Sequence, residues 1–394
     1  HPTGFSSHAG GLGNNTVALV GPPSALYYNP GALAFSPVRE VFGSIDAIYQ
    51  GSRAKFYGDA QTEVLQRLRG TQAGLRVALP ATQGGASVAG AIQQPAVFDD
   101  IVAFNGSFIN ADGQEVSVDR YFKTFGGLYH TSFGFGAQFL PNFGMGLSAG
   151  LVAGNEDVRH EFLRLTDGTV AESVADDFVR DADRGYVGYD VRIGALYYLQ
   201  DVFSIGARLV LPQRIRFSES VSETYPNSPR TRPYNDTFYG ELLSSYKAAF
   251  GATAMLPFGT VIAEVRGRAP YTFVKPNERI PSSSPASHYR MGAGIGVEIP
   301  LVFVPLVGRA AYSWNEFDTH EYVVNYDNES LDWSDGGIEV VRDRHSVNVG
   351  FGYVVQNVKF GLDYNYSTWE LVTNEQLEQD YVSHRIGLSA GITY

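Results

Sequence analysis

Charged residues of opposite sign recur at positions that share one face of an expected β-strand. The pairs are Lys359 with Asp363, Arg290 with Glu298, and Asp190 with Arg192, and Arg309 is a further candidate on the strand next to Arg290 and Glu298. Because side chains alternate between the two faces of a strand, the members of each pair point to the same side. Opposite charges in an interior usually pair with each other and brace it. An arginine without such a partner could instead bind a ligand carboxylate through two parallel hydrogen bonds, and the sequence leaves both interpretations open.

A second polar group interrupts an apolar strand that we expect at Ser87–Phe98. Gln93 and Gln94 precede Pro95, which has no N–H and so removes one hydrogen bond from the strand ladder. We therefore expect a bulge or a break at Pro95. Two glutamines in an apolar environment are costly, so we interpret Gln93, Gln94, Pro95 and the terminal Phe98 as the rim of an opening. The alternative is that the strand simply ends near Pro95.

The sequence offers little support for catalysis. No His-Glu-x-x-His motif and no phosphate-binding glycine-rich loop is present, so we predict no catalytic residues, no cofactor and no enzyme activity. The acidic stretch from Asp327 to Asp335 could bind Ca²⁺ at the surface, but it lacks the spacing of a known calcium loop. A solvated loop is the simpler interpretation, and we predict no metal ligands.

The composition excludes several classes of protein. The chain has 394 residues and a net charge of −12, from Lys+Arg 29 against Asp+Glu 41, and such an acidic surface repels nucleic acid. Cysteine is absent, which excludes disulfides and thiolate metal sites. There is no run of about 18 apolar residues, so we predict no transmembrane helix.

From about Val38 onward, apolar residues alternate with small or polar ones. The clearest stretches are Met145–Leu151, Phe203–Leu211, Met291–Ile299, Val347–Val355, Val358–Tyr366 and Ile386–Tyr394. This pattern is typical of a transmembrane β-barrel, whose apolar side chains face lipid and whose polar ones face the interior. The chain ends on an aromatic residue, which resembles the C-terminal signal of bacterial outer-membrane barrels.

The connections predict how the strands are joined. Short turns at Pro141-Asn142, Pro257-Phe258 and Gln356-Asn357 alternate with long polar segments such as Phe56–Thr71, in which Thr62–Leu68 has helical character. Short turns on one side and long loops on the other are typical of outer-membrane barrels. Counting strands between the connections predicts about fourteen, all antiparallel and closed into one barrel over residues 39–394.

The N-terminal stretch Ser24–Phe35 fits neither period. Asn29-Pro30-Gly31 breaks both a helix and a strand, although the flanking residues are too apolar for a solvated loop. An irregular apolar segment needs partners for its backbone groups from whatever surrounds it. We therefore predict that residues 1–38 form a plug, or hatch, inside the barrel lumen. An ordinary turn between two strands is the alternative.

The N-terminal region resembles the hatch of the FadL/TodX family. The resemblance rests on Gly4–Ser7, Gly11–Gly13, Ala25–Tyr28 and Asn29–Leu33, with Gly31 where the family usually has alanine. It covers roughly the first forty residues, and beyond them only the architecture agrees. The resemblance implies an outer-membrane transporter of fatty acids, aromatic hydrocarbons or other hydrophobic compounds, with the hatch motif at Asn29, Pro30 and Gly31.

The resemblance also implies a route and a location. Cargo would leave sideways, through a gap in the wall at a kinked third strand, and here that assigns the gate to Gln93, Gln94, Pro95 and Phe98. In the family the N-terminus reaches into the lumenal binding site, which assigns Phe5 to cargo. The expected location is the bacterial outer membrane, in contact with lipid and lipopolysaccharide, after removal of a signal peptide.

Two other functions remain open on the sequence. A FadL-shaped barrel could be a docking subunit of a secretion or surface-assembly machine, with the segments 222–236 and 318–337 as its contact surfaces. A periplasmic acceptor or a secretion protein would then be its partner. The third possibility, a hydrophilic porin, is disfavoured by the expected plug, because a plug closes the aqueous path.

Overall fold

The structure is a computed structural model of the whole chain. It describes the chain apart from residues 1–5, 22–23, 36–37, 57–58, 81–83, 110–114, 167–168, 171–177, 201, 227–233, 245, 270–271, 275–288, 302, 317–337 and 374–376. Within the described residues, no helix is long and apolar enough to serve as a membrane span.

Three short helices form the N-terminal segment, which we define as residues 6–35. They are α1 (Ser7–Gly11), α2 (Ala25–Tyr28) and the 3₁₀ helix η1 (Pro30–Phe35). The Ser6 hydroxyl caps α1 by accepting a hydrogen bond from the Ala9 N–H at 3.2 Å. α2 ends at Asn29 because the following Pro30 cannot continue an α-helix hydrogen-bond ladder.

Everything after the N-terminal segment is β-structure. The strands among the described residues are β1 (Glu40–Phe56), β2 (Asp59–Leu79), β3 (Ala86–Val97), β4 (Asp100–Ile109), β5 (Glu115–Leu140), β6 (Phe143–Thr166), β7 (Thr169–Val170), β8 (Phe178–Leu199), β9 (Phe203–Val210), β10 (Gln213–Thr224), β11 (Tyr234–Ser244), β12 (Lys247–Leu256), β13 (Gly259–Arg268), β14 (Thr272–Val274), β15 (Arg290–Leu301), β16 (Leu306–Asn315), β17 (Ile338–Val355), β18 (Val358–Thr373) and β19 (Leu377–Thr393).

The strands close into a barrel. β1 pairs antiparallel with β19, from Glu40 opposite Thr393 to Phe56 opposite Leu377, so the first and last strands complete the ring. Several strands are interrupted and continue in line, as β9 and β10 do. Taking each interrupted pair as one gives a closed antiparallel barrel of fourteen wall strands, which confirms the fold class predicted from the sequence. Closure leaves no free edge at the two ends of the strand order, because the first and last strands pair with each other.

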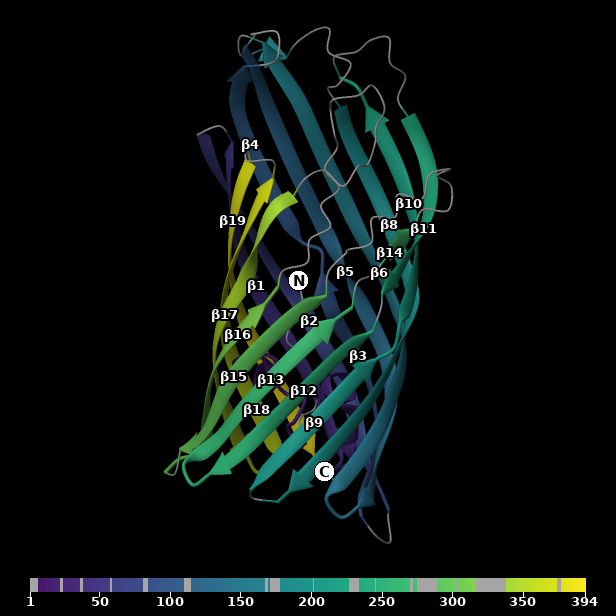
Figure 1. Ribbon diagram of the computed structural model, residues 1–394, viewed down its shortest axis with the longest axis vertical. Helices are drawn as coiled ribbons and strands as arrows, with labels where there is room; N and C mark the ends of the chain where they lie inside the picture. Colours follow the sequence, from purple (N-terminus) through teal and green to yellow (C-terminus); the bar gives the residue numbers. More distant parts are fainter. Residues whose placement is uncertain are drawn as a thin grey trace.

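The two ends of the barrel differ (Figure 1). The predicted tight turns at Pro141-Asn142, Pro257-Phe258 and Gln356-Asn357 are confirmed, and they gather at the lower end in the view, which we call the turn end. β5, β6 and β8 extend far toward the opposite end, which we call the outer end. Apolar side chains on the outer surface are exposed at alternate positions, as on β19 at Ile386, Leu388 and Ile392.

The N-terminal segment packs against inward-facing side chains of the barrel. Its α2 and η1 contribute Leu26 and Leu33 to a core shared with Phe42 of β1, Ala91 of β3 and Leu196 of β8. In Figure 1 its purple helices lie within the outline of the barrel, toward the turn end. The packed core of this molecule therefore lies between the N-terminal segment and the wall, while the outer surface of the wall stays apolar and exposed.

One local expectation is wrong. Residues 59–71 of the loop predicted at Phe56–Thr71, which include the stretch Thr62–Leu68 predicted to have helical character, are instead part of β2. Its residues pair with β1 along the whole length of that strand, from Phe56 opposite Asp59 to Glu40 opposite Arg76. A continuous cross-strand ladder outweighs a helix preference of a few tenths of a kcal/mol per residue.

Some expectations concern residues that the structure does not describe. They are Phe5, the acidic stretch from Asp327 to Asp335, the segment 318–337, and residues 227–233 of the segment 222–236. The predicted boundary between a plug at 1–38 and a barrel at 39–394 stays a prediction, with β1 beginning at Glu40.

Candidate functional site: an interrupted wall strand beside the lumen

The third wall strand, made of β3 and β4, is broken near its middle. β3 pairs with β2 only as far as Gln93 opposite Gln72. Its register to β5 shifts between Gln93 and Ala96, on either side of Pro95, where the sequence predicts an interruption. β4 then pairs with β5, and among the described strands none pairs with residues 59–71 of β2 on this side. The backbone ladder of the wall is therefore absent over this interval.

The first residues of β4 lie against inward-facing side chains of the neighbouring wall. The Asp100 carboxylate accepts hydrogen bonds from Gln50 Nε2 at 3.1 Å and from the Tyr381 hydroxyl at 3.3 Å. The Ser52 hydroxyl donates to the Ile101 carbonyl. These contacts come from β1 and β19, so the third wall strand bends into the lumen instead of continuing beside β2.

Side chains join β2 to β5 across the interval. The Asp99 carboxylate accepts a hydrogen bond from Arg69 Nε of β2 at 3.1 Å, and another from the Gly126 N–H of β5 at 3.1 Å. The Arg67 guanidinium lies 3.9 Å from the centre of the Phe125 ring, a cation–π contact. Contacts of this kind can be remade by rotation of side chains, whereas a strand ladder cannot.

Two adjacent glycines of β5 accommodate the break. Gly126 has φ 141, and a Cβ there would lie 2.0 Å from the Asn155 carbonyl oxygen. A Cβ on Gly127 would lie 2.6 Å from Nε2 of Gln94. Only glycine fits at these two positions, so the close packing of β5 beside the break depends on them.

The residues that the sequence assigned to a gate meet at this break, apart from Phe5. Gln93 is 1% exposed, and its amide has no hydrogen-bond partner among the described residues. Gln94 is fully buried, and Pro95 is half-buried between the two strand pairings. The Phe98 ring lies 5.4 Å from the Tyr186 ring of β8, so it faces the lumen.

Some of the inward-facing side chains at the outer end are apolar. Val158 of β6, Ala182 of β8 and Val221 of β10 form one buried cluster, against which Phe122 and Phe238 pack. The Phe217 ring extends this surface toward Tyr186, 6.1 Å away, and so toward Phe98. Buried ion pairs lie among these residues, since Glu219 is 3.1 Å from both Arg180 and Arg184, so apolar and paired charged side chains together line the path from the outer end to the break.

Three neighbouring strands place cations side by side in the lumen. Lys247 of β12 lies opposite Arg268 of β13, which lies opposite Arg290 of β15; we call these residues the cationic row. Lys247 donates to Oε1 of Gln213 at 3.2 Å. The buried Nε of Arg290 has no hydrogen-bond partner among the described residues. Like charges directly opposite each other repel, and one anion already lies near the row, because Gln213 also donates to the Asp190 carboxylate at 2.7 Å.

The charge pairs expected from the sequence are only partly formed. Asp190 and Arg192 do pair, at 2.5 Å. Arg290 does not pair with Glu298, which binds Arg309 at 2.7 Å and His8 of the N-terminal segment at 2.9 Å.

Lys359 does not pair with Asp363 either. Lys359 lies 3.1 Å from Glu40, and Asp363 lies 2.6 Å from Arg385. Face sharing along one strand was the wrong criterion here, because partners on adjacent strands are closer than residues separated along one strand.

Asn29-Pro30-Gly31 fastens the N-terminal segment to β8. Nδ2 of Asn29 donates to the Val17 carbonyl at 2.6 Å and to the Ala195 carbonyl of β8 at 3.0 Å, and its Oδ1 accepts from the Gly31 N–H at 2.9 Å. A Cβ on Gly31 would lie 2.9 Å from the Ala195 Cα, so the motif sits against the wall backbone. The close approach explains why glycine fits better than alanine at this position.

A buried tyrosine ties two parts of this segment together. The Tyr28 hydroxyl of α2 donates to Oδ1 of Asn14 at 2.7 Å. Burial raises the pKa of the Tyr28 hydroxyl well above its usual value, so it stays a hydrogen-bond donor.

Two Gly-x-Ser-x-Gly stretches, at Gly146–Gly150 and Gly387–Gly391, match the motif of a hydrolase nucleophile. That motif works on a sharp turn between a strand and a helix. Here both stretches lie inside strands, β6 and β19, and the Ser389 hydroxyl contacts Ser7 of the N-terminal segment. Both stretches are therefore closely packed parts of wall strands and do not form the turn that a nucleophile needs.

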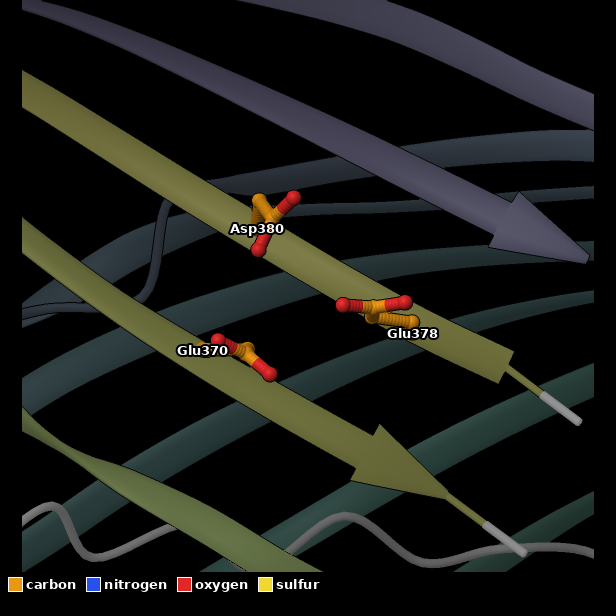
Figure 2. Close-up of side chains that lie close together, drawn as sticks. All are labelled: Glu370, Glu378 and Asp380. Carbon is orange, nitrogen blue, oxygen red and sulfur yellow. The ribbon is translucent and has the colours of Figure 1, made fainter. Parts of the chain in front are cut away.

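Three carboxylates from β18 and β19, Glu370, Glu378 and Asp380, converge within 4.8 Å of one another (Figure 2). Carboxylate oxygens are ligands that Ca²⁺ prefers. The Lys55 ammonium lies 3.9 Å from Glu378 and offsets part of the negative charge. Exposed acidic groups often cluster without binding a metal, and the surface Ca²⁺ site suggested by the sequence was a different segment.

Sequence reasoning missed most of what surrounds the break. Arg67, Arg69 and Asp99 gave no signal, because a charged residue on a strand looks like any lumenal charge. Gly126-Gly127 could have been noticed, since adjacent glycines inside a strand often mark a bulge. The cationic row depends on the register between strands and has no sequence signature.

These features define a fourteen-stranded antiparallel barrel that holds its own N-terminal segment and has an interrupted third wall strand. No family model matches the chain, and no curated protein matches it. Solved structures do match over nearly the full length of both chains.

A FadL homologue from Pseudomonas aeruginosa is 12% identical, with 100% of this chain and 99% of that chain covered and a TM-score of 0.63. The toluene transporter TodX from Pseudomonas putida is 13% identical, with coverage of 99% and 98% and a TM-score of 0.63. The toluene transporter TbuX from Ralstonia pickettii is 12% identical, with coverage of 98% of each chain and a TM-score of 0.60. The chain therefore has the fold of the FadL-like barrels, as the resemblance implied.

Proposed function

We propose that this protein is an outer-membrane channel for the passive uptake of hydrophobic small molecules. The observation that carries the proposal is the interrupted third wall strand, in which side-chain contacts replace a backbone ladder near an apolar cluster in the lumen. The barrels of the same fold include toluene transporters and a FadL homologue, which supports transport of apolar cargo.

The outer surface supports a place in a membrane. Exposed aromatic residues bound an apolar band on β5, from Tyr129 (40% exposed) near its middle to Phe139 (66% exposed) at the turn end. Between them Phe133 and Phe135 also face outward. Ten residues of strand span roughly 33 Å, and a tilt near 40° reduces this to about 25 Å, the height of the apolar band of an outer-membrane barrel.

The N-terminal segment supports a sideways route. Its backbone and side chains bond to strands around the barrel, including β13 through Val17 and Glu264, β8 through Asn29, and β3 through Leu33 and Ser87. We propose that this segment acts as a hatch closing the lumen toward the turn end. Cargo that enters at the outer end would then leave through the wall at Gln93, Pro95 and Phe98.

The cationic row supports an anionic head group on the cargo. A carboxylate beside Arg290, whose buried Nε has no hydrogen-bond partner among the described residues, would gain a charge-assisted bond, while an alkyl chain would lie against the apolar residues near Phe98. A fatty-acid-like molecule satisfies both requirements. An aromatic hydrocarbon satisfies only the second.

The side exit is tested by Pro95→Val, with Pro300→Val as the matched control because Pro300 ends β15 away from the break. Uptake of a labelled long-chain fatty acid is measured in cells whose own transporter is deleted, and folding is checked by heat-modifiable gel mobility. We expect Pro95→Val to restore part of the ladder and lower uptake, and Pro300→Val to leave it unchanged. Normal uptake by a folded Pro95→Val barrel would argue against the side exit.

The head group is tested separately with Arg290→Gln. We expect uptake of the fatty acid to fall about tenfold, because a charge-assisted bond to the carboxylate is lost, while uptake of labelled toluene is unchanged. An equal fall for both compounds would mean that Arg290 supports the lumen and does not recognise an anion.

A further inference from the structure

The outer surface changes from apolar to polar at one level of the barrel. On β6 and β8, Leu151 lies opposite Tyr189, and both are exposed apolar residues. Two residues farther toward the outer end, Ala153 lies opposite Val187. The next outward-facing positions are polar or small, beginning with Asn155 opposite Gly185 and continuing with Asp157 opposite Asp183. The edge of the apolar band therefore falls at the level of Val187.

Two arginines face outward here, one at this level and one just on its turn-end side. Arg216 of β10 lies opposite Val187, and Arg214 is the preceding outward position, next to the pair of Ile215 and Gly188. Their side chains are 72% and 49% exposed. Arginine at the edge of an apolar band extends its charged end toward the polar region while its stem stays on the apolar surface.

One carboxylate accepts hydrogen bonds from both arginines. Glu241 of β11 accepts hydrogen bonds from Nε and Nη2 of Arg214, each at 2.7 Å, and from Nε of Arg216 at 3.2 Å. The two Nη groups of Arg216 have no partner among the described residues. Two cations share one anion, so this group of three residues, which we call the arginine patch, keeps an excess positive charge and free donors.

We propose that the arginine patch binds the phosphate group of an anionic lipid in the leaflet around the outer end. Lipid phosphates lie at the edge of the apolar layer, which is the level of Val187, and a planar guanidinium matches a phosphate with two donors. The proposal rests on the proposed function, since it requires the barrel to lie in a membrane. It adds a lipid-binding site on the outer surface of the wall, apart from the lumen.

The test is native mass spectrometry of the purified barrel with bound lipid. The probes are phosphatidic acid, which carries a phosphate monoester, phosphatidylcholine, which is neutral overall, and free inorganic phosphate. The variants are Arg214→Gln/Arg216→Gln and Arg216→Lys. The control is Arg159→Gln, because Arg159 is also outward and 50% exposed but is bonded to the two carboxylates of Glu161 and Asp181 in the polar region.

We expect the native barrel to retain phosphatidic acid about tenfold more than phosphatidylcholine, and the double glutamine variant to lose that preference. Arg216→Lys should keep part of it and Arg159→Gln all of it. No preference in the native barrel, or an unchanged one in the double variant, overturns the proposal. So does saturation by inorganic phosphate alone, since the occupant would then not be a lipid.

The two proposals fail differently. A barrel that transports fatty acid but shows no lipid preference refutes the arginine patch and leaves the channel intact. A barrel that binds phosphatidic acid through the patch but transports nothing refutes the channel and leaves the membrane location intact.

Discussion

The amide of Asn29 fixes the N-terminal segment to the wall, and its removal should loosen that segment without unfolding the barrel. Asn29 is fully buried and makes three hydrogen bonds, to Val17, Ala195 and Gly31. Asn29→Ala leaves three buried backbone groups without these partners. The wall ladder is untouched, because only the Ala195 carbonyl belongs to a strand.

The size of the effect follows from these three bonds. Each buried hydrogen bond contributes about 1 kcal/mol net, and a group left without a partner costs somewhat more, so about 3 kcal/mol is expected. Since 1.4 kcal/mol is a factor of ten, the equilibrium for local opening of the segment should rise by roughly a hundredfold. Asn29→Asp keeps the acceptor for Gly31 but loses both donors, and its charge would face two carbonyl oxygens. It should be at least as disruptive.

Hydrogen–deuterium exchange of the amides between Ser24 and Phe35, measured in detergent by mass spectrometry, reports this opening. Ser24→Ala is the matched control, because the Ser24 hydroxyl is equally buried but has no hydrogen-bond partner among the described residues. We expect much faster exchange in Asn29→Ala and none of that change in Ser24→Ala. Exchange in Asn29→Ala within about threefold of the native rate would refute the assignment of Asn29 as the fastening residue.

Three further substitutions test other contacts. Gly31→Ala places a Cβ 2.9 Å from the wall backbone, so we expect a loss of about 1–3 kcal/mol in docking of the segment, measured by the same exchange. Ser7→Cys/Ser389→Cys should form a disulfide, since the two hydroxyls are in contact and the chain has no other cysteine. If the segment must move, the disulfide should stop fatty-acid uptake, and a reductant should restore it. Unchanged uptake with the disulfide formed would contradict a moving hatch. Arg76→Leu removes the buried partner 2.6 Å from Glu40 and leaves Lys359, 3.1 Å away, as the remaining cation. It should cost about 3 kcal/mol of stability, the low end for breaking a buried ion pair, seen as a lower temperature of the gel-mobility shift.

Much of the fold could be predicted because the sequence pattern of a β-barrel wall is local. Alternating residues such as Ile386, Leu388 and Ile392 face outward whatever their neighbours are, and a turn such as Gln356-Asn357 needs only its own residues. The wrong prediction of helical character at Thr62–Leu68 also came from judging a stretch by its own residues alone. That stretch lies in the part of β2 that lacks a partner on one side, where charged residues replace the usual alternation.

The site could be predicted only where one residue type forces a backbone change. Pro95 was such a residue, and the register shift falls around it. The bond between Asp99 and Arg69, and the alignment of Lys247 with Arg268, depend on how distant strands are aligned. No local pattern contains that alignment.

β3 connects the N-terminal segment to the break. This connection determines how the proposed channel could open. Its inward residues follow in order: the Ser87 hydroxyl donates to the Leu33 carbonyl, Ala89 and Ala91 pack in the core of the segment, and Gln93 ends the pairing with β2. A movement of the segment therefore acts directly on the strand whose end borders the interval in the wall. If the segment is a hatch, β3 contacts the hatch at one end and borders the side exit at the other. Movement of the hatch then reaches the exit through this single strand.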